Sequence, residues 1–430
     1  MKTQIGSAVK CILTVSVILL IVCMGNEKLI ASTLQSAQRD SLNYVQYKGS
    51  VMDSKTRKTL VFALMSLDGA NISTITNSEG EFSIKIPKNI TEGHLTVSYL
   101  GYKNTVVNFK DMKPEKTQIL LDPFVITLRE ISIIPKDPEV LIREVMSRRG
   151  QNYGGEQNQM TAFYRETIRK RKTYVSLSES VVEIQKQPYT TDLEDKVELF
   201  HGRKNTDYTK LDTVTFKLQG GPYSSLYLDV MKYPENLFTE NMIANYEFSM
   251  GINTKIGEHL VYVLLFRQRP NIYEPLYYGK LYIDMESLAI ISATFNLNVS
   301  ERAAASRMFI KKKPAAALVY PTLATYQVNY REKNGKWVFG YSRGEVIFKV
   351  NWNKKFFNTF YESTIEMAVT DWEKKSDEVA QVNAKLKPNV IMMDKVSDFS
   401  DPLFWGEYNI IEPEKSIESA IKKIQKSLEN

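Results

Sequence analysis

The sequence predicts a mostly β protein in two parts, a small antiparallel β-sandwich followed by a larger antiparallel sheet with a few covering helices. Short runs in which apolar and polar residues alternate fill positions 49–109, and longer runs rich in Tyr, Phe, Val, Ile and Thr dominate positions 160–371. A period of two is the pattern of a half-buried strand, and β-branched and aromatic residues favour strands. The larger sheet is expected to be either open and curved or a half-barrel.

The first part, residues 38–123, shows the strand pattern most clearly. Phe82, Ile84 and Ile86 alternate with polar residues, so their side chains are expected on one face of a strand. The preceding residues 77–80 have turn chemistry, since a glycine at the last position can take the positive φ that a tight hairpin needs. These features predict a compact sandwich domain.

The same residues resemble the carboxypeptidase-regulatory-like domain. The resemblance is carried by Gly49-Ser-Val-Met-Asp53, Thr74-Ile-Thr-Asn-Ser-Glu-Gly-Glu-Phe82 and Val97-Ser-Tyr-Leu-Gly-Tyr102, with Asn77 where the family usually has Asp. It implies a transthyretin-like sandwich, which is common in cell-envelope proteins of Bacteroidetes-type bacteria, and it brings no catalytic residues. Because one fold serves many functions, the resemblance assigns no activity.

The N-terminus, residues 1–32, is expected to be a secretory signal peptide. Lys2 and Lys10 precede an apolar run over 11–24, which is shorter than the roughly twenty residues of a membrane-spanning helix. We therefore expect an exported protein, periplasmic or associated with the outer membrane. Lipid attachment at Cys23 is an open alternative to ordinary cleavage.

Composition excludes some classes of site. Both cysteines lie in the expected signal peptide, so a mature chain could form no disulfide. The net charge is +7, with 56 Lys and Arg against 49 Asp and Glu, and the basic residues are scattered. No nucleic-acid partner is expected. The basic run Lys311-Lys-Lys313 is interpreted as a solvated loop.

The second part, residues 138–430, follows an expected linker at 124–137. Asp137 is a suitable N-cap for a helix over 138–149, and an apolar stripe predicts a C-terminal helix at 414–428. The pair Asn334-Gly335 between two strand patterns is the strongest hairpin signal in the chain.

This second part resembles an uncharacterised β-rich envelope family that follows the regulatory-like domain in Bacteroidetes. The matching motifs are Phe163-Tyr-Arg-Glu166, Tyr278-Gly-Lys-Leu-Tyr-Ile-Asp284 and Asp401-Pro-Leu-Phe-Trp-Gly-Glu-Tyr-Asn409. The second motif is also similar to the half-barrel of periplasmic lipoprotein carriers. These resemblances imply a periplasmic domain without an assigned activity.

Catalytic motifs are weak, so no catalytic, cofactor or metal residues are expected. The Gly-x-Ser-x-Gly sequence at 340–344 continues as a strand pattern and has no later histidine, unlike a nucleophile elbow. The three histidines are isolated, which speaks against zinc. Glu179 and Glu183 would share one strand face, but such carboxylates are more often solvated or paired with Arg.

We therefore expect a non-catalytic envelope protein in which the sandwich is an adaptor and the larger sheet binds a partner, a glycan or a polymer. The alternative is a half-barrel carrier of a lipid or lipoprotein acyl chain, and a glycoside or ester hydrolase is less expected. Outer-membrane proteins, glycans, lipids and the membrane itself are possible partners. Phe404, Trp405 and Tyr408 concentrate aromatic surface near the C-terminus, and we expect them to form a latch or binding surface.

Overall fold

A computed structural model describes most of the chain: residues 43–124, 137–171, 173–206, 218–313, 315–353, 358–372, 384–398, 404–415, 417 and 419. The expected signal peptide, nearly all of the expected linker and most of helix 414–428 lie outside these residues. The chain divides into two compact units, residues 1–45 with 86–90 and residues 46–85 with 91–430. The second unit contains the described strands of the large sheet, the C-terminal segment and residues 46–85 of the sandwich.

The N-terminal strands form two small sheets, as expected for a sandwich. Their bounds are β1 (Tyr44–Asp53), β2 (Leu64–Leu67), β3 (Ser73–Ile75), β4 (Glu81–Pro87), β5 (His94–Ser98), β6 (Thr105–Asn108) and β7 (Thr117–Leu121). One sheet has the order β4-β1-β7 and the other β3-β2-β5-β6. The expectation of a wholly antiparallel sandwich is wrong, because β1 and β7 pair in parallel. Only strands joined by a tight hairpin must be antiparallel, and these two are far apart in the chain.

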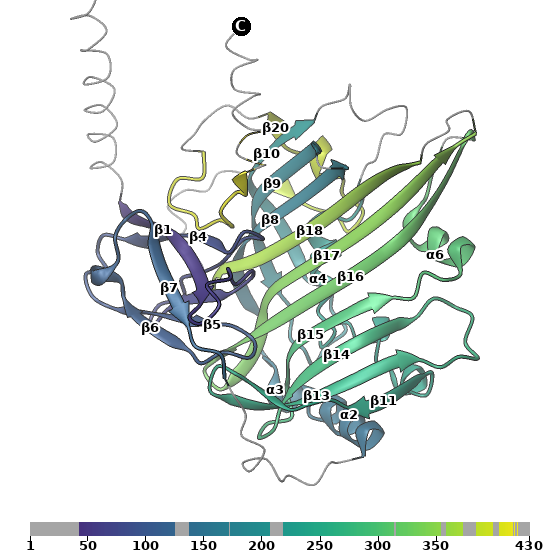
Figure 1. Ribbon diagram of the computed structural model, residues 1–430, viewed down its shortest axis with the longest axis horizontal. Helices are drawn as coiled ribbons and strands as arrows, with labels where there is room; N and C mark the ends of the chain where they lie inside the picture. The colour runs from purple at the N-terminus through teal and green to yellow at the C-terminus, as the bar shows by residue number, and fades with distance from the viewer. Residues whose placement is uncertain are drawn as a thin grey trace, which may run out of the picture. The chain divides into compact units, whose positions relative to one another are not determined.

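The larger part is a thirteen-stranded sheet within the described residues. Its strands are β8 (Asn158–Lys170), β9 (Thr173–Lys186), β10 (Lys196–Thr206), β11 (Tyr246–Met250), β12 (Thr254–Ile256), β13 (His259–Gln268), β14 (Tyr277–Asp284), β15 (Ile290–Leu297), β16 (Ala317–Lys333), β17 (Lys336–Trp352), β18 (Thr359–Asp371), β19 (Ala384–Lys385) and β20 (Ser397–Asp398). The main path is β11-β13-β14-β15-β16-β17-β18-β8-β9-β10-β19, and Figure 1 shows the long strands β16 to β18 side by side. Neighbours on this path pair antiparallel, which confirms the larger antiparallel curved sheet.

The hairpin expected at Asn334-Gly335 joins β16 to β17. Lys333 pairs with Lys336 across the turn, and Asn334 and Gly335 have φ values of 52° and 71°. Two successive positive φ values are those of a type I′ turn, whose twist matches that of the flanking strands.

Helices are few and short. They are α2 (Pro138–Ser147), α3 (Arg149–Asn152), α4 (Pro222–Leu226), α5 (Glu240–Ile243) and α6 (Arg302–Phe309), with 3-10 turns at Phe109–Asp111, Pro234–Asn236 and Met392–Asp394. The Asp137 side chain accepts hydrogen bonds from the backbone N–H groups of Glu139 and Val140, so it caps α2 as expected. The helix ends two residues earlier than expected, and α3 follows it. No helix within the described part of the chain is long and apolar enough to cross a membrane.

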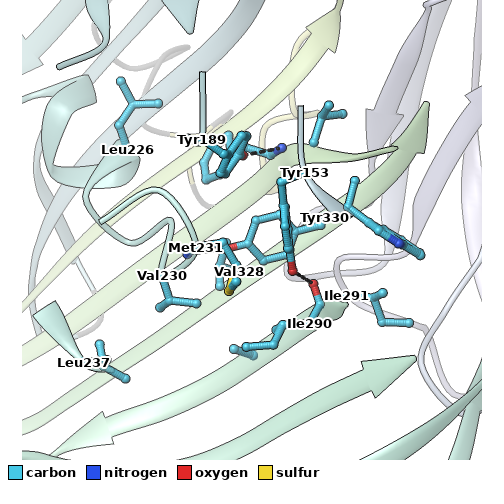
Figure 2. Packing of buried hydrophobic residues seen from close by; sticks show 14 of the residues in the cluster. Tyr153, Tyr189, Leu226, Val230, Met231, Leu237, Ile290, Ile291, Val328 and Tyr330 are labelled. Carbon is cyan, nitrogen blue, oxygen red and sulfur yellow. Dashed lines mark hydrogen bonds between the residues drawn. The ribbon is translucent and has the colours of Figure 1, made fainter. Parts of the chain in front are cut away.

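The large sheet is covered on both faces near β8 and β9. On one face, which we call the covered face, Ala162, Tyr164 and Val182 pack with residues of α4, α5 and segment 386–396 in the main core. Figure 2 shows part of this core, in which the ring of Tyr153 lies between those of Tyr189 and Tyr330 and its hydroxyl donates to the carbonyl of Ile290 at 2.6 Å.

The opposite face, which we call the tail face, has a different cover. There Phe163 and Val181 pack against Trp405 and Ile411 of the C-terminal segment and against Ile75 of the sandwich. The tail face therefore joins three distant parts of the sequence.

Candidate functional site

The three C-terminal aromatic residues named by the sequence lie on the tail face. Trp405 is only 5% exposed, and its ring stands edge-on to Phe163 with centroids 5.5 Å apart. Phe404 and Tyr408 are half-buried, and they pack against His201 and Phe200 of β10 with centroid separations of 5.5 and 5.0 Å. The structure thus brings all three against the large sheet.

The backbone around these residues also bonds to the sandwich. We call residues 404–415 the tail segment. The Asn409 side chain accepts from the Lys85 backbone N–H at 2.7 Å and donates to the Lys85 carbonyl at 3.2 Å. Thr74 and Asn77 donate to the carbonyls of Ile410 and Glu412 at 3.3 and 3.1 Å. The tail segment therefore bonds to the sandwich and packs on the sheet at the same time.

Beneath the tail segment lies a buried ionic cluster centred on Arg165 of β8. Its guanidinium donates to Glu179 of β9 at 2.8 Å, to Glu366 of β18 at 3.1 Å and to the carbonyl of Ile411 at 2.8 Å. Arg165 is 2% exposed, and Glu179 is fully buried. A cluster of this kind is stable only when each charge has a partner, and here the tail segment supplies one of the acceptors.

Two further arginines complete the cluster. Arg203 of β10 donates to the second oxygen of Glu179 at 2.8 Å, and Arg343 of β17 lies 3.2 Å from both Glu366 and Glu345. Burial alone would raise the pKa of Glu179, but the adjacent charges of Arg165 and Arg203 outweigh it and lower the pKa. The carboxylate is therefore ionised in the folded protein.

A pocket of about 160 Å³ opens beside this cluster. Its lining comes from the sheet, the sandwich and the C-terminal residues: Ser78, Arg165, Thr167, Arg169, Tyr174, Arg343, Glu345, Glu362, Thr364, Glu366, Glu414 and Ile417. Glu414 accepts hydrogen bonds from the hydroxyls of Ser78 and of Tyr174, the latter at 2.8 Å. Burial would raise the pKa of Glu414, but these bonds and the nearby charges of Arg165 and Arg343 outweigh it and lower the pKa.

The lining is polar and almost balanced in charge. Three arginines face four glutamates, with hydroxyl groups from Ser, Thr and Tyr between them, and Ile417 is the single aliphatic residue among them. The pocket therefore offers both hydrogen-bond donors and hydrogen-bond acceptors. Its volume of about 160 Å³ is below the roughly 300–1,000 Å³ of most small-molecule sites.

A second buried ionic cluster lies on the covered face. Lys186 of β9 is 2.8 Å from both Asp195 and Asp229, and all three are almost completely buried. Tyr189 and Tyr330 each donate to Asp229 at 2.8 Å. Burial disfavours the ammonium of Lys186, but the two aspartates outweigh it and raise its pKa. Aromatic side chains surround this cluster, so we interpret it as part of the core that stabilises the fold.

Other positions weighed in the sequence lie apart from the pocket. The segment 340–344 is part of strand β17, and Ser342 donates to the Ser225 carbonyl at 3.0 Å. His259 pairs with Asp284 at 3.2 Å at the far side of the sheet. Within the described residues, no group of three or more His, Cys, Asp or Glu side chains could hold a metal ion.

Sequence reasoning missed the cluster itself. Glu179 was considered only with Glu183, its neighbour on the same strand face, whereas its partners Arg165 and Arg203 come from the strands on either side. The sequence did contain a signal for this cluster. In the motif Phe163-Tyr-Arg-Glu166, the charged residues Arg165 and Glu166 point to opposite faces of the strand, so each face of a largely apolar strand carries one charge.

Comparisons with known proteins identify the sandwich. Residues 47–133 match the family model of the CarboxypepD_reg-like domain. The match begins within β1 and includes β2 to β7, which confirms the resemblance drawn from the strand and turn motifs. None of the curated proteins matches the chain.

Three solved structures are distantly similar to the chain. One is a DUF1329 family protein from Desulfovibrio piger, with 9% identity over 56% of this chain and 96% of that one, and a TM-score of 0.22. A LolA superfamily protein from Nitrosomonas europaea has 10% identity over 55% and 95% of the two chains, with a TM-score of 0.18. Lipovitellin has 9% identity over 54% of this chain and 27% of its own, with a TM-score of 0.22. Scores this low establish neither a shared fold nor a shared ligand.

Proposed function

We propose that the chain is a non-catalytic, exported binding protein of the cell envelope, whose pocket beside Arg165 takes one unit of a glycan. The observation that carries this proposal is the lining of the pocket, which combines three arginines, four glutamates and the hydroxyl groups of Ser, Thr and Tyr. The signal peptide expected from the sequence supports export.

The lining matches a polyhydroxylated ligand. Each sugar hydroxyl both donates and accepts, so it can pair with a guanidinium on one side and a carboxylate on the other. Three arginines against four glutamates leave no large net charge, which favours a neutral ligand over a strongly charged one. The volume of about 160 Å³ suits a single ring, with the rest of the polymer outside.

The same lining disfavours the acyl-chain carrier. An acyl chain would meet a single aliphatic residue, Ile417, and would strip water from charged groups without replacing their hydrogen bonds. On the covered face, Leu226, Phe238 and Met392 pack directly into the main core. That packing supports a filled sheet face instead of an open apolar cavity.

The carboxyl groups also support a binding role. A glycosidase needs one carboxyl whose pKa is raised so that it can act as the general acid. The pKa of Glu414 is lowered instead, by hydrogen bonds from Ser78 and Tyr174. Glu362 and Glu366 are paired with Arg169 and with Arg165 and Arg343.

The test is binding of soluble oligosaccharides to the purified protein, with a glycan array followed by calorimetry on the hits. Glu345→Gln and Arg169→Gln change half-buried lining residues, and each should weaken a true pocket ligand at least about tenfold because a charge-assisted hydrogen bond is lost. Arg267→Gln removes an exposed ion pair between Arg267 of β13 and Glu247 of β11, and it should change nothing. Ligands that bind all three variants equally would contradict the assignment to this pocket.

A further inference from the structure

One end of the large sheet combines exposed basic and apolar side chains. We call it the sheet tip and define it by α6, the segment 310–313, and the adjacent ends of β8, β16, β17 and β18. The strand register brings these ends together: Tyr320 pairs with Lys349, Lys349 with Phe360, and Tyr361 with Lys170. Figure 1 shows α6 beside β16 and β17 at the right of the view.

The tip is strongly basic. Exposed residues are Arg171, Arg302, Arg307 and Lys311 to Lys313, and Lys170 and Lys349 are half-buried. Within the described parts of segments 168–175, 301–320 and 346–361, Glu301 is the only acidic residue. The scattered charge of the whole chain is therefore locally concentrated, because distant segments meet at the ends of neighbouring strands.

Large apolar side chains are exposed at the same tip. Met308 of α6, Leu318 of β16 and Phe360 of β18 are 51%, 54% and 44% exposed. The Lys349 ammonium lies 5.9 Å from the Phe360 ring centroid, and the Arg302 guanidinium lies 4.7 Å from that of Tyr320. Basic and apolar groups are thus interleaved, not separated into two surfaces.

We infer that the sheet tip docks on an anionic membrane surface. Anionic headgroups attract lysine and arginine, and apolar side chains beside them gain free energy by entering the boundary between headgroups and acyl chains. A water-soluble polyanion would use the basic residues but would leave Met308, Leu318 and Phe360 in water. The exposed residues Lys311 to Lys313, Met308, Leu318 and Phe360 are not among those that line the pocket beside Arg165, so the inference does not depend on the proposed ligand.

The experiment is co-sedimentation of the full purified chain with vesicles. Phosphatidylcholine vesicles are compared with vesicles of equal parts phosphatidylcholine and phosphatidylglycerol. The triple variant Lys311→Gln, Lys312→Gln and Lys313→Gln should bind the anionic vesicles about 10- to 100-fold more weakly, since each lysine near a charged surface contributes appreciably. The matched control changes three exposed lysines of the sandwich, Lys55, Lys58 and Lys113, to Gln and should bind like the unchanged protein.

The apolar contribution is tested separately. Phe360→Thr replaces the exposed ring by a smaller side chain that also favours strands. It should weaken vesicle binding several-fold, also at a salt concentration of about 0.5 M that screens the charges. Ile252→Thr alters a residue that is 90% exposed elsewhere and should have no effect. Equal binding to both vesicle types, equal losses in both lysine triples, or binding to soluble heparin but not to vesicles would each overturn the inference.

Discussion

The two buried ionic clusters lie on opposite faces of the same strand, β9, and they are completed in different ways. Lys186 on the covered face finds both of its aspartates, and the tyrosines that bond to Asp229, within the sheet and the segments packed on it. On the tail face, Arg165 needs the carbonyl of Ile411 in the tail segment as a hydrogen-bond acceptor. Through Glu366 this cluster also includes Arg343, which lines the pocket.

The difference shows that buried charge alone does not mark a functional site. Both clusters perturb pKa values, and such perturbation accompanies structural ion pairs as well as active sites. What separates them is access: the tail-face cluster has partners that line a pocket, whereas the covered-face cluster is enclosed by the rings of Tyr189, Tyr233 and Phe339 around the Lys186 ammonium. We therefore expect the first to tune binding and the second to affect folding only.

The largest expected effect comes from removing residues 400–430. The loss of Trp405, Ile411 and Ile417 from buried positions and of one acceptor for Arg165 should lower the free energy of unfolding by at least about 5 kcal/mol. Urea unfolding measures this, with binding of a fluorescent fatty acid followed in parallel. Unchanged stability would contradict a latch, and fatty-acid binding by either form would favour the carrier.

A change confined to the covered face should come next in size. Lys186→Met leaves Asp195 and Asp229 buried without their counter-charge and should cost about 3–5 kcal/mol in urea unfolding. Adding Asp195→Asn should recover part of this loss. The folded fraction of Lys186→Met should bind ligand as the unchanged protein does. Weaker binding by this variant would contradict our expectation that the covered-face cluster affects folding only.

Glu166 gives the covered face a characteristic pH response. Burial raises its pKa to about 8 from 4.5, against the effect of a hydrogen bond from Tyr164. Between these values the folded protein keeps a proton that the unfolded chain has released, so stability falls as pH rises, by at most ~1.4 kcal/mol per pH unit. Glu166→Gln should flatten this fall between pH ~5 and ~8. Glu156→Gln, at an exposed position, is the control.

Glu414 should give the tail face the opposite and smallest response. The pKa of Glu414 is lowered in the folded protein. Its contribution to the free energy of unfolding is therefore complete at pH values above the pKa of the unfolded chain, and it is lost as the pH falls through the pKa of the folded protein. Glu414→Gln should reduce stability at neutral pH by about 1 kcal/mol or less, because the group is only half-buried, and should make little difference in acid. Equal effects at pH ~7 and ~3 would show that the loss is steric.

Local patterns predicted most of the strands. Within the strand-rich positions 160–371, the alternating runs Thr161–Arg169 and Tyr174–Gln185 fall within β8 and β9. The turn at Asn334-Gly335 was predicted correctly because two adjacent residues set its conformation. Strand β10 was missed, since its residues Lys196–Thr206 mix charges with apolar residues without clean alternation.

The site was harder to predict because it is assembled across the chain. Arg165 and Glu366 are separated by 201 positions, and Ser78 and Glu414 by 336. Only the pairing of β18 with β8 and the docking of the tail segment bring these residues together. The aromatic residues near 405 drew attention by composition, whereas scattered arginines and glutamates have no such local signal.

The hydrogen bonds between Asn409 and Lys85 also bear on self-association of the protein. Strands β3 and β4 each stand at the end of their sheet, and an unpaired edge can template strand addition from another molecule. The Asn409 amide imitates a peptide group and occupies both backbone groups of Lys85, while the neighbouring tail segment lies against Thr74 of β3. Asn409→Ala would expose that edge, and we expect light scattering to reveal slow self-association before any loss of β structure.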